Sequence, residues 1–144
     1  GNDEATPTAA VRDALGAAYV VLVAPSNPVV SIAPILGVPG LRALLPEVPT
    51  VGISPIVGGA PVRGHADACL AAIGVASDAA AVARHYGARS DGGLLDGWIV
   101  DHADADAVES LRDLPLAVRP TDAVMSSPAI SAALAATAIE LVGA

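Results

Sequence analysis

The chain has 144 residues, enough for one domain with its own apolar core, and 53% of them are hydrophobic. Its formal net charge is −8, from 15 acidic residues and 7 basic residues that are all arginine, which excludes the cationic surface of general nucleic-acid or membrane-surface binders. The apolar runs are far shorter than the roughly 20 residues of a membrane span, the amino terminus is polar and acidic, and the single Cys69 allows no internal disulfide. We therefore expect a cytoplasmic protein.

Helical and strand-like segments alternate along the chain. We expect helices at residues 8–15, 40–45, 63–73, 78–86, 103–111 and 128–141. We expect strands at residues 19–24, 50–54, 97–100 and 116–118. The first strand is a continuous apolar run, typical of a central parallel strand that is buried on both faces. The alternation predicts an α/β fold around a parallel sheet.

Two segments that follow predicted strands have unusual chemistry. APSNPVVS, at residues 24–31, places two hydroxyls and an amide between prolines, which restrict the backbone. SPIVGG, at residues 54–59, combines a hydroxyl with two glycines, whose N–H groups can approach a ligand closely. Because ligands bind beyond the carboxyl ends of parallel strands, both segments are interpreted as a preformed cradle for a polar or anionic ligand. The alternative is that each is only a strand exit followed by a cap.

Five motifs in order make the sequence recognisable: PSNPVVSIAPIL, VGISPIVGG, VARHYG, LLDGWIVD and RPTDAVM. Together they resemble the carboxyl-terminal half of the 2-phospho-L-lactate transferase family. The resemblance implies a Rossmann-like parallel sheet with helices on both faces, forming half of a larger domain. It also implies a Mg²⁺-dependent reaction of coenzyme F-420 biosynthesis. In that reaction a phospholactyl or phosphoenolpyruvyl group passes from a guanosine diphosphate conjugate to a ribityl deazaflavin, and GMP is released.

The resemblance assigns residues of this chain to substrate and nucleotide binding without identifying a catalytic residue. These residues are Ser26, Asn27, Pro28, Ser31, Ser54, Gly58, Gly59, His85 and Asp122. Pro28 is expected to shape its loop, and Asn27 is the strongest candidate for a bond to the nucleotide. His85 could instead complement a helix dipole, and Asp122 could instead cap the last helix.

The resemblance also predicts what the chain would need. The family's amino-terminal half, with a glycine-rich strand loop and an acidic residue that binds metal and deazaflavin, has no counterpart in these 144 residues. Ala33 stands where the family usually has Gly, and Tyr19 stands where Asp is common. We expect the metal ligands to come mainly from that half, the chain to pack against it, and the enzyme to be a homodimer. Expressed alone, the chain should aggregate and be inactive.

The sequence also allows other interpretations. Asp101, Asp104 and Asp106 resemble a metal cluster but lack the pattern of a calcium loop, so capping of the following helix by Asp101 or Asp104 is expected. The sequence has no lysine and therefore no P-loop. The competing function is non-catalytic: a nucleotide-sugar-binding regulator of the same superfamily, or a plain nucleotide-binding scaffold. Binding of GDP and deazaflavin, as opposed to a uridine diphosphate sugar, would discriminate between the two classes.

Overall fold

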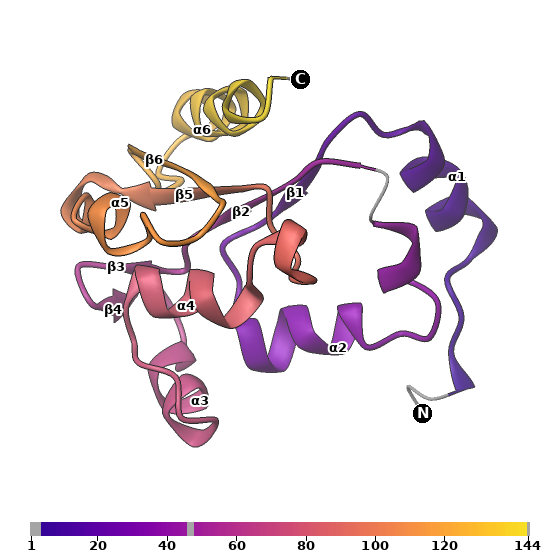
Figure 1. The fold of residues 1–144 in the computed structure, drawn as a ribbon, viewed down its shortest axis with the longest axis horizontal. Helices are drawn as coiled ribbons and strands as arrows, with labels where there is room; N and C mark the ends of the chain where they lie inside the picture. Colours follow the sequence, from indigo (N-terminus) through magenta and orange to yellow (C-terminus); the bar gives the residue numbers. More distant parts are fainter. Residues whose placement is uncertain (1–3, 46–47, 144) are drawn as a thin grey trace.

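The computed structural model describes residues 4–45 and 48–143. Its centre is a four-stranded parallel sheet with the order β1-β2-β5-β6 (Figure 1). The strands are β1 (Val21–Val23), β2 (Thr50–Ile53), β5 (Gly97–Asp101) and β6 (Ala117–Thr121). The predicted parallel α/β class is confirmed, and neighbouring strands in this sheet follow one another in chain order.

Helices cover both faces of the sheet, as expected (Figure 1). On one face, Val51, Ile53 and Ile99 pack against Leu134 and Ala138 of the last helix. On the other face, a larger cluster joins β5 to three short helices. The helix of the first face is α6 (Pro128–Leu141), and those of the second face are α3 (Ala66–Ala72), α4 (Ala79–Tyr86) and α5 (Ala107–Ser110). In contrast, α1 (Ala9–Ala17) buries none of its residues and lies at one end of the molecule.

Trp98 shows how tightly the second face is packed. Its side chain is fully buried, and its indole N–H donates to the carbonyl of Ala79 at the start of α4, at 3.1 Å. Gly52 of β2 lies directly opposite in the strand register, and a Cβ built there would be 2.6 Å from the indole ring. A side chain at position 52 would therefore collide with the ring, which explains a glycine in a buried strand.

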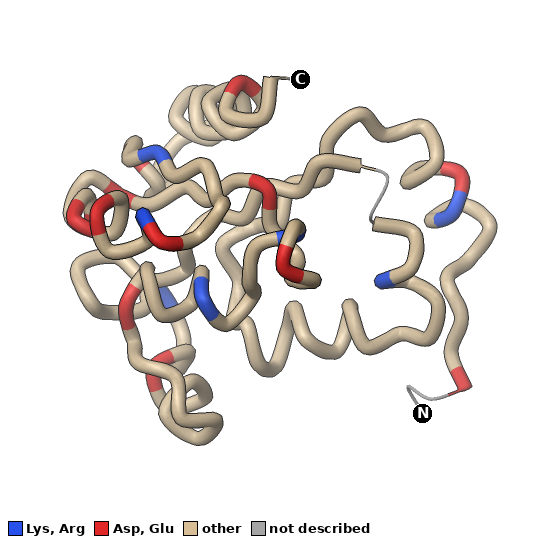
Figure 2. Tube along the Cα trace, in the orientation of Figure 1, with Lys and Arg blue, Asp and Glu red and all other residues tan. Residues whose placement is uncertain are grey.

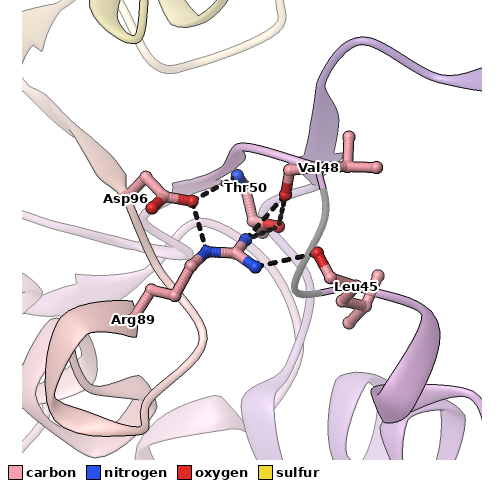
Figure 3. Close-up of polar contacts among 5 residues, drawn as sticks. All are labelled: Leu45, Val48, Thr50, Arg89 and Asp96. Atoms are coloured by element: carbon pink, nitrogen blue, oxygen red, sulfur yellow. Dashed lines mark hydrogen bonds and ion pairs between the residues drawn. The ribbon is translucent and has the colours of Figure 1, made fainter.

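Polar contacts of Arg89 hold the amino ends of the strands together (Figure 3). Its guanidinium donates to the Asp96 carboxylate at 2.7 Å, to the carbonyls of Leu45 and Val48 at 2.8 Å each, and to the Thr50 hydroxyl at 2.7 Å. Asp96 also accepts the backbone N–H of Thr50 at 2.7 Å. Because Thr50 begins β2 and Asp96 directly precedes β5, this network fixes the segment that enters β2 against the start of β5.

The segment after β1 differs from the prediction of a proline-restricted loop. A π-helical turn, Pro28–Ile32, continues directly into α2 (Ala33–Leu36). The backbone N–H groups of Ile32 and Ala33 donate five residues back, to the carbonyls of Asn27 and Pro28. A proline in the first helical turn costs no hydrogen bond, which is why Pro28 is compatible with a helix here.

The place of the first strand was also predicted wrongly. The apolar run at 19–24 forms only a three-residue strand, and β1 is an edge of the sheet with all three side chains half-buried. Tyr19, before the strand, is 68% exposed. An apolar run shows that a strand can be buried on both faces. It does not show whether other strands of this chain pair with both of its edges.

The remaining elements agree with the predictions only in part. The short antiparallel pair β3 (Ile56–Val57) and β4 (Ala60–Pro61) was not predicted, and the expected helix at 40–45 is a short 3-10 helix, Arg42–Leu44. Helix 128–141 has its predicted limits, and its buried residues are Leu134 and Ala138. Among the described residues, no helix combines the length and the apolar character needed to cross a bilayer.

Candidate functional site

A cavity of about 630 Å³ opens at the carboxyl edge of the sheet. Its walls come from the segments that follow β1, β2 and β6, together with the chain that returns from β4. The residues that line it are Pro25, Ser26, Asn27, Ser54, Pro55, Val62, Arg63, Gly64, Ala66, Ala123, Val124, Met125 and Ser126. The structure thus brings together Ser26, Asn27 and Ser54, three residues that sequence reasoning assigned to one ligand site.

Asn27 begins the helical segment after β1. Its side-chain oxygen accepts the backbone N–H groups of Val29 at 2.9 Å and Val30 at 3.2 Å, so it acts as an N-cap. The carboxamide nitrogen is a donor, and it is the part of this side chain suited to an anionic ligand. The two proposed roles of this segment, capping and ligand binding, therefore use opposite ends of the same amide.

Ser54 is 1% exposed and shapes the exit from β2. Its hydroxyl donates to the carbonyl of Ile56 at 2.8 Å and accepts the N–H of the same residue at 3.2 Å. This turn directs the chain into the hairpin of β3 and β4. The hydroxyl is therefore part of the cavity wall while its hydrogen bonds are made within the protein.

The glycine pair forms the tip of that hairpin and does not line the cavity. Gly58 and Gly59 have φ values of 58° and 77°, and both positions of a tight two-residue hairpin turn of type I′ require positive φ. The N–H of Gly58 donates to both oxygens of the buried Asp104 carboxylate, at 3.1 and 2.9 Å. Gly59 lines a different cavity, beside Asp78 and Asp106. Their predicted place in the same cleft as Ser26 and Asn27 is not what the structure shows.

The remaining predicted residues lie elsewhere. Pro28 and His85 line a separate cavity of about 300 Å³ next to Tyr86, whose buried phenol has a raised pKa because burial disfavours its charged form. Ser31 is half-buried in the π-helical turn. Asp122 is exposed and directly precedes Ala123 of the main cavity. Neither Ser31 nor Asp122, both within the described part of the chain, belongs to the lining of the main cavity.

Asp101 positions one wall of the main cavity. One carboxylate oxygen accepts the N–H of Ala103 and caps the 3-10 helix His102–Asp104, which confirms the predicted capping role. The other oxygen accepts the N–H of Ala123 at 3.0 Å. This second bond holds the segment after β6 against the end of β5, and no sequence pattern indicated it.

Sequence reasoning missed two polar residues of the cavity lining, Arg63 and Ser126. The N–H of Val62 donates to the carbonyl of Pro55 at 3.4 Å, so the returning chain lies beside the exit from β2 and places Arg63 at the cavity. A cation four residues after a glycine pair, in a chain of net charge −8, was the available signal.

A magnesium site does not fit the described residues by themselves. The lining of the main cavity contains neither Asp nor Glu. In the ranges 4–45 and 48–143, no three His, Cys, Asp or Glu side chains are grouped closely enough to hold a metal ion. Mg²⁺ prefers carboxylate and other oxygen ligands, and the described lining of this cavity offers hydrogen-bond donors but no carboxylate.

Comparisons with known proteins agree with the motifs. A family model described as 2-phospho-L-lactate transferase CofD matches residues 1–132. A phosphoenolpyruvate transferase of Thermobifida fusca is 52% identical over 144 residues, which cover 98% of this chain and 41% of that protein. Proteins of the same name from Streptomyces griseus and Mycobacterium sp. (strain KMS) are 52% and 46% identical, with 44% and 42% of their lengths covered. The chain therefore spans less than half the length of these curated relatives.

Proposed function

Because this chain belongs to the 2-phospho-L-lactate transferase family CofD, we propose that it is part of a phosphoenolpyruvate transferase of coenzyme F-420 biosynthesis. The reaction moves a phosphoenolpyruvyl group from a guanosine diphosphate conjugate to a hydroxyl of a ribityl deazaflavin and releases GMP. The observation that carries this proposal is the family match over residues 1–132 together with relatives of that name at 46–52% identity. Their name favours phosphoenolpyruvate over phospholactate as the transferred unit.

The cavity at the carboxyl edge supports binding of the nucleotide part. Cleavage of a diphosphate linkage requires the phosphates to be held in line with the attacking hydroxyl and their charge to be stabilised. Ser26 and Asn27, whose side chains carry a hydroxyl and an amide donor, line one wall of the cavity, and Ser126 lines another. Their proposed role is to bind and orient the donor substrate. None of them is assigned a part in making or breaking a bond. Ligand contacts of Pro28, Ser31, Ser54, Gly58, Gly59, His85 and Asp122 stay predictions.

The rest of the enzyme is proposed to pack on the uncharged surfaces of this chain. The helical segment 28–36 and residues 128–139 of α6 contain no Arg, Asp or Glu, as Figure 2 shows for both regions. Tyr19, which precedes β1, and Val30 and Ile35 of the helical segment after it are exposed by 68, 62 and 55%. A parallel edge strand with half-exposed apolar side chains is typical of a sheet that continues. We propose the preceding part of the same polypeptide as the continuation, with a homodimer, a cytoplasmic location and magnesium dependence of the whole enzyme as further parts of the proposal.

The test uses the complete polypeptide, meaning this chain joined to the remaining part that its relatives carry. Calorimetry should detect binding of GDP and of the deazaflavin, and turnover should require both substrates and Mg²⁺. This chain alone should elute as aggregates or higher oligomers and should be inactive. Preference of the complete polypeptide for a uridine diphosphate sugar, without turnover, would reject the transferase in favour of a nucleotide-sugar-binding protein.

A further inference from the structure

We propose that Arg63 binds the phosphate oxygens of the nucleotide ligand in the main cavity. The inference rests on the proposed function for the nature of the ligand, a nucleoside diphosphate or its ester, and it adds the group that recognises the charge. Arg63 is exposed and belongs to the cavity lining, together with Ser26, Asn27 and Ser126.

The pairing of the arginines sets Arg63 apart. Four of the seven form ion pairs with carboxylates: Arg84 with Asp113, Arg89 with Asp96, Arg112 with Glu109, and Arg119 with Glu140. Arg12 donates to the carbonyl of Pro7. Within the residues that the structure describes, Arg63 has neither an ion pair nor a hydrogen bond, although acidic residues outnumber basic ones by 15 to 7. Arg42 also lacks a carboxylate partner among the described residues, but it lines two other cavities.

The backbone holds Arg63 at the cavity while its side chain stays available. The hydrogen bond from Val62 to Pro55 fixes the residue before it, and Gly64, with φ of 77°, turns the chain toward the buried Ala66 at the start of α3. The direction of the chain at this point is therefore set by its neighbours and not by a contact of the guanidinium. No energy of an existing ion pair has to be given up when the guanidinium binds a ligand.

The surroundings favour an anion over a neutral or cationic ligand. Because the described lining contains no carboxylate, nothing in the cavity wall neutralises Arg63. Ser26, Asn27 and Ser126, whose side chains carry hydroxyl and amide donors, line the other walls. A guanidinium forms two parallel charge-assisted hydrogen bonds with phosphate oxygens, and this geometry is not available to the point charge of lysine.

The experiment measures GDP and guanosine binding to the complete polypeptide by calorimetry, with guanosine measured in competition where it binds weakly. Arg63→Gln should raise the Kd for GDP by about 10- to 100-fold, the range for loss of a charged hydrogen bond, and leave the Kd for guanosine within about 2-fold. Arg63→Lys should lie between wild type and Arg63→Gln. The salt dependence of GDP binding should be weaker in Arg63→Gln than in the wild type.

Arg42→Gln is the matched control, since the Arg42 side chain also has no ion pair or hydrogen bond within the described residues and lies outside the main cavity; it should leave GDP binding within about 2-fold. Thermal unfolding shows which variants are folded. If Arg63→Gln does not fold, the GDP affinity of Arg63→Lys tests the proposal. Unchanged GDP affinity in a folded Arg63 variant would overturn the inference, as would equal losses for GDP and guanosine. Failure of the wild type itself to bind GDP would instead reject the proposed function.

Discussion

Removal of the Arg89 guanidinium should destabilise the fold without affecting the ligand cavity. Arg89→Met keeps the length and most of the volume of the stem and removes every hydrogen bond of the head group (Figure 3). Asp96 then loses its cationic partner but keeps the N–H of Thr50. The carbonyls of Leu45 and Val48 lose their charged donor.

The size of the effect follows from burial. Hydrogen bonds to charged groups contribute about 1.5–3 kcal/mol each, so four independent bonds would give about 6–12 kcal/mol. They are not independent, and the side chains of Arg89 and Asp96 are 21 and 32% exposed, so water replaces part of what is lost. Breaking a fully buried pair costs about 3–5 kcal/mol. For this half-buried network we expect a loss of about 2–4 kcal/mol in the free energy of unfolding.

Urea unfolding of the complete polypeptide, followed by circular dichroism, measures this loss. Arg112→Met is the control, because Arg112 pairs only with Glu109 on an exposed surface and should change stability by less than about 0.5 kcal/mol. GDP binding should be the same in both variants, since Arg89 lies at the amino ends of the strands and the cavity at their carboxyl ends. If Arg89→Met lowers the free energy of unfolding by less than about 0.5 kcal/mol, the change expected of the control, this reasoning is refuted.

Three further predictions concern single side chains. Asn27→Ala should lower helix stability by about 1 kcal/mol and weaken GDP binding by about 1–3 kcal/mol. Asn27→Asp should keep the cap and lose only the amide donor, so unfolding measures the loss of the cap and calorimetry measures the loss of GDP binding. Gly52→Ala should destabilise by about 1–3 kcal/mol through its clash with Trp98, while Gly16→Ala, in open space within α1, should stabilise slightly in the same urea assay. Burial raises the pKa of Tyr86, so the unfolded chain ionises first, and wild-type stability should fall above about pH 10 more steeply than that of Tyr86→Phe; equal pH slopes would contradict this.

The sequence was sufficient for elements whose limits are marked by local chemistry. The last helix begins and ends where predicted because Ser127 caps it, accepting the N–H of Ile130, and Pro128 occupies the first turn. The helix after Asp78 is confirmed for the same reason, with Asp78 accepting the N–H of Ala81. Such signals lie within a few residues of the feature that they specify.

Features that depend on distant partners could not be predicted. A proline after a strand is compatible both with a loop and with the first turn of a helix. Pro28 lies in the first turn of a helix. Gly58 and Gly59 have the freedom to approach a ligand or to form a hairpin tip, and Asp104, 46 residues away, accepts the N–H of Gly58 and fixes the second arrangement. The edge position of β1 likewise depends on which other strands pair with it, and the residues of β1 alone do not indicate this.

The division of polar groups at the cavity explains what the chain contributes to a larger enzyme. The Asn27 oxygen, the Ser54 hydroxyl and the Asp101 carboxylate are bonded to the backbone, so the three segments that form the walls are set before a ligand binds. The groups suited to a ligand are donors: the Asn27 amide nitrogen, the Ser26 hydroxyl and, as we propose, Arg63. A carboxylate in this wall would pair with Arg63 and weaken its attraction for phosphate. The proposed place of the acidic metal ligands, on a separate part of the polypeptide, would avoid that competition.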